Sequence, residues 1–402
     1  MPTYKYIGKN RRGQRKKGTI ESRSKNQAVQ MLREMNLMPI EIVETQPSIW
    51  KQDITIGNPV KSQDFVIYCR QFATLIRAGI TIIDATRILA KQTESKALKK
   101  VLQQMDEDLQ KGTAISAAVE KHRKVFPSMF VNMMKAGEAS GNLDETLDRL
   151  ATYFEKQFQL KKKIQSAMSY PIAIGLVTVG VVMFLLASVV PTFVDMFAQF
   201  DAQLPAITVF VLDASDFVQA YWWLLILVIA LIVIGIILLQ KRDERVSYWI
   251  GYISLKTPLF GKLLQKAAVA RMTRTLSSLF ASSVPILQAL TIVEKVVDHP
   301  VLGKVIFEAR DSLEKGNSLA QPLEDSWVFP PLVSQMVQIG EETGSLDLML
   351  AKVADFYEDE VERSVDSLKS LIEPLMIVLL AGIVGTIVLA IMLPMFEIFN
   401  AF

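Results

Sequence analysis

The sequence predicts a mainly α-helical integral membrane protein with two homologous cytoplasmic helical bundles, three transmembrane helices and a small N-terminal α+β domain. Three observations predict this fold class. Long apolar segments occur three times, a pattern of more than one hundred residues occurs twice, and the first 45 residues resemble a strand hairpin followed by a helix. Of the 402 residues, 50% are apolar and 21% are charged, which favours water-exposed lobes joined to apolar helices.

The composition also argues against several classes of function. A net charge of +3 is too small to indicate binding to nucleic acid. The single cysteine, Cys69, excludes an intrachain disulfide, and with two histidines a zinc site made of Cys and His is not expected. The first ten residues, MPTYKYIGKN, lack an apolar core, so we expect no cleavable signal peptide and a cytosolic N-terminus.

Residues 1–45 are expected to form the small N-terminal domain. The segments YKYIG and TIES flank a basic turn around Gly13 and predict a hairpin, a helix follows over Ser24–Asn36, and LMPIEIVE predicts a third strand. The basic turn is either a solvated hairpin tip or a contact with anionic membrane lipid or an acidic partner. A polar linker, residues 46–61, follows this domain.

Three segments are long and apolar enough to cross a bilayer. Residues 170–194 contain no charged side chain, and at about 1.5 Å per residue a helix of roughly 20 residues spans the hydrocarbon layer. Residues 221–239 contain 14 Leu, Ile or Val residues, which strongly favours insertion. Residues 373–396 form the third segment, with one acid at its start.

Flanking charges predict the orientation of these helices. Lys161–Lys163 precede the first helix and QKRDER follows the second, whereas residues 195–220 between them hold four Asp and no Lys or Arg. By the positive-inside rule, the bundles and the connector of residues 240–262 face the cytoplasm. The acidic loop of residues 195–220 and the C-terminal residues 397–402 are then on the other side.

Residues 62–169 and 263–372 are predicted to be two copies of one bundle of about six helices, each followed by a membrane helix. At a shift of 204 residues KGTAISAAV, from Lys111, matches KGNSLAQPL, from Lys315. After a one-residue deletion the shift becomes 203, and FPSMFVNMMKAGEASGNLDETL matches FPPLVSQMVQIGEETGSLDLML. The segment 221–239 has no counterpart, because a return crossing must come before a second bundle can face the cytosol.

Helix ends in the first bundle carry recognisable signals. Ser62 is predicted to cap the first helix, with Asp64 in its first turn, and Gly79 to follow it in a left-handed conformation. Ser283 occupies the position of Gly79 in the second bundle, where that conformation would cost up to ~1 kcal/mol, so this turn is expected to differ. The third helix is predicted over Ser95–Lys111.

The motif G-E-x-[ST]-G-x-L-D occurs once in each bundle and has two interpretations. One is a turn that fixes how two helices meet, in which Asn142 caps the second helix and Glu145 completes a capping box. In that case the leucine of each motif fills the core. The other is a contact with a partner protein through exposed acidic corners formed by the glutamate and aspartate of each motif. The candidate residues are Gly137, Glu138, Gly141, Leu143 and Asp144 in the first bundle and Gly340, Glu341, Gly344, Leu346 and Asp347 in the second.

Four prolines at matching positions open and close the first and third membrane helices. They are either ordinary helix boundaries or points where motion of the bundles is coupled to the membrane helices. They are Pro171 and Pro191 in the first copy and Pro374 and Pro394 in the second.

Catalysis finds little support in the sequence. It contains no phosphate-binding loop G-x-x-x-x-G-K-[ST], no G-x-G-x-x-G, no H-E-x-x-H and no G-x-S-x-G. His122 and His299 are interpreted as ordinary surface histidines. The membrane segments hold no internal ionisable residue of the kind that transport pathways use. We therefore expect neither an enzyme nor a transporter, and no metal or other cofactor.

With its paired motifs, two bundles each followed by a proline-bounded membrane helix, and short N-terminal domain, the chain resembles the inner-membrane platform proteins of type IV pilus assembly and type II secretion. The resemblance covers essentially the whole sequence. Two positions depart from the family pattern: Ser283 replaces a glycine, and Leu348 replaces an acid or amide.

The resemblance implies a non-enzymatic protein of the bacterial inner membrane, with a cytoplasmic N-terminus and a periplasmic C-terminus. Its implied partners are a hexameric cytoplasmic assembly ATPase, pilin or pseudopilin subunits, other inner-membrane assembly proteins and a second copy of the chain. Motion of the ATPase would tilt or rotate the bundles, and the membrane helices would lift pilin from the bilayer.

Alternatives remain open at this point. The equivalent platform of a type II secretion system has the same architecture, so the residues do not separate it from a pilus platform, although the pilus is favoured. A small-solute transporter or a membrane sensor is the more remote possibility.

Overall fold

The computed structural model describes residues 3–10, 15–22, 25–34, 37–45, 58–192, 205–258 and 260–401. Gly13 in the predicted hairpin turn, most of the predicted linker, and the first part of the predicted acidic loop lie outside these ranges. The chain divides into two units, residues 1–59 and residues 60–402, and each is described by itself.

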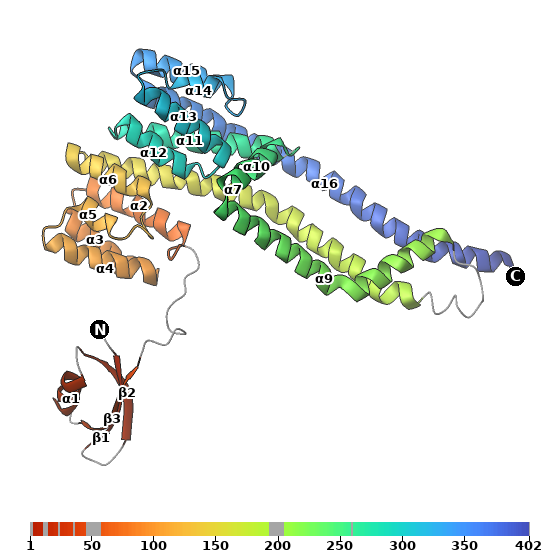
Figure 1. The fold of residues 1–402 in the computed structure, drawn as a ribbon, viewed down its shortest axis with the longest axis horizontal. Helices are drawn as coiled ribbons and strands as arrows, with labels where there is room; N and C mark the ends of the chain where they lie inside the picture. Colours follow the sequence, from red (N-terminus) through yellow and green to blue (C-terminus); the bar gives the residue numbers. More distant parts are fainter. Residues whose placement is uncertain are drawn as a thin grey trace. The chain divides into compact units, whose positions relative to one another are not determined.

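The first unit is a three-stranded antiparallel sheet with one helix (Figure 1). Strand β1 lies in the centre and pairs with β2 on one side and β3 on the other. Leu32 on the helix and Tyr4 on β1 are buried, because α1 packs its apolar face against the sheet. The hairpin, the helix and the third strand are therefore confirmed. Their bounds are β1 Thr3–Asn10, β2 Arg15–Glu21, α1 Lys25–Glu34 and β3 Leu37–Thr45.

In the second unit, one order of six helices occurs twice. In both copies three helices come first, a very short helix follows, and the last two helices carry the repeated motif between them. The first copy comprises α2 Ser62–Arg77, α3 Ile82–Gln92, α4 Lys96–Gln110, α5 Ile115–Glu120, α6 Ser128–Ser140 and α7 Leu143–Phe184. The second comprises α11 Phe260–Ala281, α12 Ile286–Val296, α13 Pro300–Glu314, α14 Ala320–Glu324, α15 Pro331–Thr343 and α16 Leu346–Ala401.

The same ion pair holds the first and last helix of each bundle together. Arg70 on α2 donates to Glu155 on α7 over 2.6 Å, and Arg274 on α11 donates to Glu358 on α16 over 2.7 Å. These residues match at the shifts of 204 and 203 that relate the two copies. The internal repeat is thus present in side-chain contacts as well as in helix order.

Two predictions about the ends of α2 and α11 were wrong. Ser62 is the first helical residue and Lys61 precedes it at the cap position, where no side chain caps the helix. Ser283 adopts the left-handed conformation with φ 58°, as Gly79 does with φ 82°. The turn therefore does not differ, because the same two backbone bonds close it: Ser283 N to Phe280 O and Val284 N to Leu279 O in the second copy.

The last helix of each bundle continues without a break into the apolar segment that follows it (Figure 1). Helix α7 passes into a π-helical turn, η2 Leu185–Val189, and the chain stays helical to Thr192. The two long helices run parallel, since they pack together near the bundles, at Leu160 and Val361, and again near their far ends, at Val190 and Ala390.

The described part of the predicted acidic loop, residues 205–220, is helical from Ala206 onwards, which corrects its assignment as a loop. Helix α9 begins at Ala206 and runs to Arg242, so it is longer than the expected membrane segment 221–239. It bends by 47° between Leu224 and Ile226. Helix α10, Glu244–Lys256, occupies the predicted connector. In the described residues, two helices are long and apolar enough to cross a membrane, and a third if the bent α9 counts as one crossing.

Candidate functional site at the repeated motif

The second glycine of each motif ends a helix. Gly141 follows α6 with φ 74° and Gly344 follows α15 with φ 69°, a left-handed conformation that glycine adopts without steric cost. Each turn is closed by the same backbone bond over 3.0 Å, from Asn142 N to Gly137 O and from Ser345 N to Gly340 O. These glycines therefore have the left-handed turn conformation that the turn interpretation requires.

The first glycine of each motif allows two helices to approach closely. A Cβ atom on Gly137 would lie 2.4 Å from Oγ1 of Thr146 on α7. On Gly340 it would lie 3.0 Å from the Cα atom of Leu346 on α16. Both distances are below normal contact, so a larger residue would push the helices apart. Leu143 and Leu346 pack against the core beside these glycines, as the turn interpretation predicts.

The glutamate of each motif caps the short helix of its own bundle. The Glu138 carboxylate accepts hydrogen bonds from the backbone N–H groups of Ile115, over 3.0 Å, and Ser116, over 3.3 Å, at the start of α5, and from the Ser116 hydroxyl. In the second bundle the Glu341 carboxylate accepts from the N–H groups of Leu319, over 2.7 Å, and Ala320, over 3.3 Å.

A carboxylate at this place satisfies N–H groups that a helix start leaves without partners and interacts favourably with the helix dipole. Glu138 and Glu341 are therefore engaged within the chain and are not free acidic corners. Sequence reasoning missed this role, although one signal was present: KGTAISAAV and KGNSLAQPL, which contain the capped helix starts, repeat together with the motif.

The predicted capping box at α7 is wrong. The Asn142 side chain makes no cap hydrogen bond, and the Asn142 backbone, at φ −105° and ψ 50°, lies outside the extended region that such caps use. Glu145 instead contacts Arg149, one turn further along, over 2.5 Å. Since Gly141 ends α6 in the left-handed conformation, α7 begins directly after the turn without this box.

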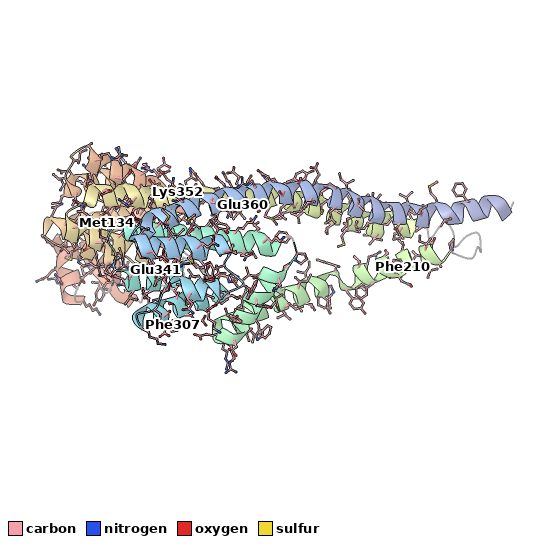
Figure 2. The ribbon with its side chains drawn as sticks, turned by 90° about the horizontal axis from the view of Figure 1, so that it is seen from above. Met134, Phe210, Phe307, Glu341, Lys352 and Glu360 are labelled. Atoms are coloured by element: carbon pink, nitrogen blue, oxygen red, sulfur yellow. The ribbon has the colours of Figure 1, made fainter. Side chains whose placement is uncertain are left out.

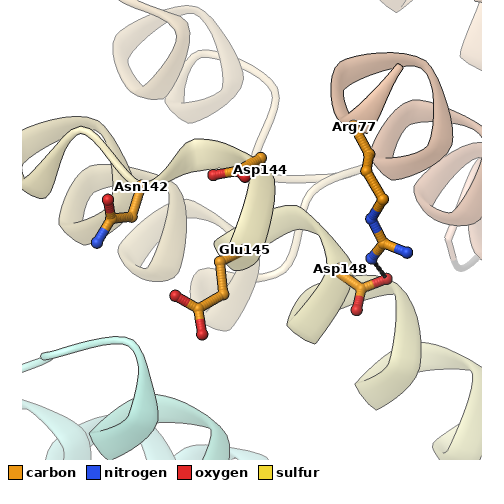
Figure 3. Close-up of a pocket in the computed structure, with 5 residues that line it drawn as sticks. All are labelled: Arg77, Asn142, Asp144, Glu145 and Asp148. Atoms are coloured by element: carbon orange, nitrogen blue, oxygen red, sulfur yellow. Dashed lines mark ion pairs between the residues drawn. The ribbon is translucent and has the colours of Figure 1, made fainter. Parts of the chain in front are cut away.

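The exposed part of the first motif faces an open hollow of about 420 Å³ (Figure 3). Asn142, directly before α7, and Asp144 and Glu145 in its first turn line the hollow, together with the ion pair between Arg77 of α2 and Asp148. Its floor is polar and charged, so it can accept a charged side chain of a partner. At the matching positions the second bundle has Ala281 for Arg77 and Leu348 for Glu145. Asp347 is exposed there, as Asp144 is here.

Three of the four prolines lie well inside helices, and Pro191 is next to the last described helical residue of its segment. Pro171 is in the middle of α7, and positions 374 and 394 lie within α16. The interpretation as ordinary helix boundaries is therefore wrong for these three. Pro191 directly follows the π-helical turn and Val190.

Polar contacts also join the two bundles. Lys156 on α7 contacts Asp355 over 2.9 Å and Glu358 over 3.0 Å on α16, and the hydroxyls of Tyr153 and Thr275 lie 3.1 Å apart in a buried contact. Burial alone would raise the pKa of Asp355, but hydrogen bonds from Lys156 and Arg274 outweigh it and lower the pKa. These pairs could not be predicted from the sequence, because the partners are far apart along the chain.

Neither histidine is the ordinary surface residue that was expected. Both are half-buried, and burial lowers the pKa of His122 and of His299. His122 lies after α5 and His299 directly precedes α13, where its ring is close to Ser254 of α10.

Comparison with known protein families shows which family has this architecture. The family model for the type II secretion system (T2SS) protein F matches residues 68–191 and again residues 272–394, and the model for the N-terminal domain of the same protein matches residues 1–43. The chain belongs to the type II secretion system protein F family.

Named relatives of the F family match almost the whole chain. A type IV pilus assembly protein PilC of Thermus thermophilus is 40% identical over 99% of this chain and 98% of its own length. PilC of Myxococcus xanthus is 37% identical over 98% of this chain and 94% of its own. The type II secretion system protein F of Vibrio cholerae is 35% identical over 100% of this chain and 99% of its own.

The two F-family matches begin and end at equivalent positions. They start at Tyr68 and Met272, which are 204 residues apart, and end at Pro191 and Pro394, which are 203 apart. Each matched segment therefore contains one motif, one long helix and one outer proline, and the internal repeat predicted from the sequence is confirmed.

Proposed function

We propose that this protein is the inner-membrane platform of a type IV pilus machine, which couples a cytoplasmic assembly ATPase to extraction and polymerisation of pilin subunits. The observation that carries the proposal is the continuity of α7 and α16, each a single helix from a motif-bearing bundle into an apolar segment. Relatives named as type IV pilus assembly proteins over nearly the full chain support it.

In this proposal α7, α9 and α16 cross the bacterial inner membrane. The domains follow the ranges predicted from the sequence, with the N-terminal domain and both bundles in the cytoplasm and the C-terminus in the periplasm. Charge supports this orientation: Lys161–Lys163 and the basic end of α9 flank the apolar segments on the bundle side, whereas Asp213 and Asp216 lie near the far end.

The structure suggests how force would pass through the molecule. One hydrophobic core extends through both bundles, so they are expected to move together. A helix resists bending over a few turns, and no helix end interrupts α7 or α16 between bundle and membrane. Tilting the joined bundles therefore moves the membrane ends of both helices. The chain itself is expected to perform no chemistry, so the work comes from the ATPase.

The exposed side of the motif is the proposed contact for the ATPase. Glu138 and Glu341 are occupied within the bundles, which leaves Asp144 and Asp347 as the exposed acids that both motifs have in common. The hollow beside Asp144 adds charged groups for such a contact. Pilin, other inner-membrane assembly proteins, lipid and a second copy of the chain would meet the apolar parts of α7, α9 and α16.

A genetic experiment tests the proposed function. Deleting the gene should abolish surface fibres, and the wild-type gene should restore them, as counted by electron microscopy. The double variant Asp144→Lys with Asp347→Lys should accumulate normally yet lose co-purification with the ATPase, because both changed positions are exposed. Asp84→Lys, exposed elsewhere in the first bundle, is the matched control. Normal fibres in the deletion strain would refute the platform role.

The second candidate is the equivalent platform of a type II secretion system. It is favoured by the Vibrio cholerae relative, which is 35% identical over 100% of this chain. The same deletion strain separates the two candidates. Loss of exported hydrolases from the culture medium with surface fibres intact would replace the pilus proposal by the secretion one.

A further inference from the structure

The outer prolines of the two repeats each remove a hydrogen-bond donor from a long helix. A proline has no backbone N–H, so the carbonyl that its N–H would serve in a regular helix is left without that partner. Water can replace the donor at an exposed surface, but a site buried in protein or lipid offers no such replacement. Pro191 and Pro394 stand at equivalent positions, 203 residues apart, so both copies of the repeat have this problem.

In the first copy, the carbonyl affected is that of Leu186. The π-helical turn shifts the bonding pattern, so that Val190 N–H bonds to the Leu185 carbonyl, five residues back. In the same pattern the Leu186 carbonyl would accept from residue 191, which is proline. The Ser215 hydroxyl of α9 donates to this carbonyl over 2.6 Å, and the Ser215 side chain is almost completely buried. Gln219 donates to the Ser215 oxygen over 3.0 Å and, at the longer distance of 3.4 Å, to the Leu186 carbonyl as well.

In the second copy, the carbonyl affected is that of Ala390. Helix α16 follows the regular pattern, in which the residue at 394 would donate four residues back to Ala390. The Thr208 hydroxyl, also from α9 and also buried, donates to the Ala390 carbonyl over 2.7 Å. Two buried hydroxyls on one helix thus serve the two carbonyls that the repeat-related prolines leave without a backbone donor.

Apolar packing surrounds both hydrogen bonds. Leu186, Val190, Val211, Ile387 and Ala390 form a separate buried cluster here, remote from the cores of the bundles. Along the first half of α9, Thr208, Val211 and Ser215 are buried, which is the spacing of one helix face. Figure 2 shows Phe210, on the same segment, far along the long helices from Met134 and Glu341 in the bundles.

We infer that the first half of α9, Ala206–Leu224, is a crossbar that fastens the outer ends of α7 and α16 to each other, with Ser215 and Thr208 replacing the N–H groups that Pro191 and Pro394 lack. The 47° bend after Leu224 directs this segment across both helices before α9 returns towards the bundles. Only the role of the crossbar in fibre assembly rests on the proposed function. It makes the two outer ends move as one when the bundles move.

A thermal double-mutant cycle on the purified full chain in detergent micelles tests the hydrogen bonds. Ser215→Ala should lower the unfolding midpoint by about 1–2 °C. In the Pro191→Ala background, residue 191 regains its N–H, so the same serine change should lower the midpoint by less than half as much. Equal losses in both backgrounds, or no loss at all, would overturn the inference.

The threonine has a matched control in α16. The Thr386 hydroxyl donates to the carbonyl of Gly382 in its own helix, over 2.7 Å, so Thr386→Val removes a hydroxyl without touching the crossbar. Thr208→Val should lower the midpoint more than Thr386→Val does. A larger effect at Thr386 would contradict the role assigned to Thr208.

Fibre counts in cells test the role of the crossbar. The double variant Ser215→Ala with Thr208→Val should reduce surface fibres at least tenfold while the protein still accumulates. The single variant Ser215→Thr keeps the hydroxyl, so it should form fibres in wild-type numbers. Wild-type fibre numbers in the double variant would overturn the role in assembly. If the deletion strain itself keeps its fibres, the platform proposal fails, but the thermal cycle still decides whether the hydroxyls replace the missing N–H groups.

Discussion

Glu138 and Glu341 join two parts of each bundle that are more than twenty residues apart in the sequence. Each carboxylate spans from the helix before the motif turn to the start of the short helix α5 or α14. Replacing a capping group by alanine leaves the N–H groups at the helix start unsatisfied. We expect Glu138→Ala to lower the free energy of unfolding by about 1–2 kcal/mol.

The neighbouring acid supplies the control for this prediction. Asp144 is exposed in the first turn of α7, where its charge interacts only weakly with the helix dipole, so Asp144→Ala should change the free energy of unfolding by less than about 0.5 kcal/mol. Denaturant titration of both variants gives the comparison. Similar losses for the two substitutions would show that Glu138 is not the cap of α5.

Ser283 is held in a conformation that glycine adopts more easily. With φ 58° it pays a steric cost that Gly79, in the matching turn, does not. Ser283→Gly should therefore stabilise the protein by up to about 1 kcal/mol, and Gly79→Ser should destabilise it by a similar amount. Thermal midpoints of the two variants test the pair. A destabilising Ser283→Gly would contradict the account of this turn.

Half-buried histidines make the stability of the bundles depend on pH. Because burial lowers the pKa of His299 in the folded chain, the unfolded chain takes up a proton first, below its ordinary pKa of about 6.5. Stability should be unaffected by this group above that pH and should fall as the pH is lowered through the unfolded and then the folded pKa. His122 adds the same trend. Between pH 7.5 and 5.0 the unfolding midpoint of the His122→Gln, His299→Gln double variant should fall less than that of the wild type. An equal fall in both proteins would refute this role of the histidines.

At the scale of elements, the repeated ion pair differs in its burial. The Arg274 side chain is 12% exposed and the Arg70 side chain 37% exposed. Removing Arg274 would leave Glu358 in a partly buried site with fewer hydrogen bonds. Arg274→Met should therefore cost about 1.5–3 kcal/mol of unfolding free energy, and Arg70→Met about 1 kcal/mol or less. Chemical denaturation of both variants measures the difference, and an equal or reversed order would contradict it.

Most helices were predictable from their own residues, because apolar spacing and capping signals act locally. The third helix of the first bundle was predicted at Ser95–Lys111 and is α4, Lys96–Gln110. The start of α9 was not predicted, because residues 195–220 were interpreted only as the acidic connection between two membrane helices. Asp213 and Asp216 are exposed on the helix, while Thr208 and Ser215 face inward. Thr208 and Ser215 have the spacing of one helix face in the sequence. That they donate to carbonyls of other helices could be recognised only once the structure showed which carbonyls lack a backbone donor.

The structure of the motif was predictable only in part, because some of its contacts are local and others join distant parts of the chain. The left-handed glycine and the core leucine act within a few residues, so the turn could be derived from the sequence. The glutamate acts on a helix start more than twenty residues away, and the contacts of Lys156 and Tyr153 join the two bundles. Such contacts depend on how the helices pack, which a single sequence does not specify.

At the scale of the whole molecule, duplication explains most of the architecture. Two bundles with the same helix order share one core, and two continuous helices lead away from them in parallel. The first half of α9, which has no counterpart in the repeat, joins the far ends of those helices. Joined at both ends, the two copies are suited to act as one lever.

Labelling from each side of the membrane tests this account most directly. Lys111 and Lys315 are exposed and occupy equivalent positions in the two bundles, and Asp216 lies on the crossbar. Native Cys69 should give little background, since burial raises the pKa of its thiol. With single variants Lys111→Cys, Lys315→Cys and Asp216→Cys, a membrane-impermeant maleimide should label the two bundle positions only in inverted vesicles and the crossbar position only in intact spheroplasts. Labelling of the two bundle positions from opposite sides would contradict the account.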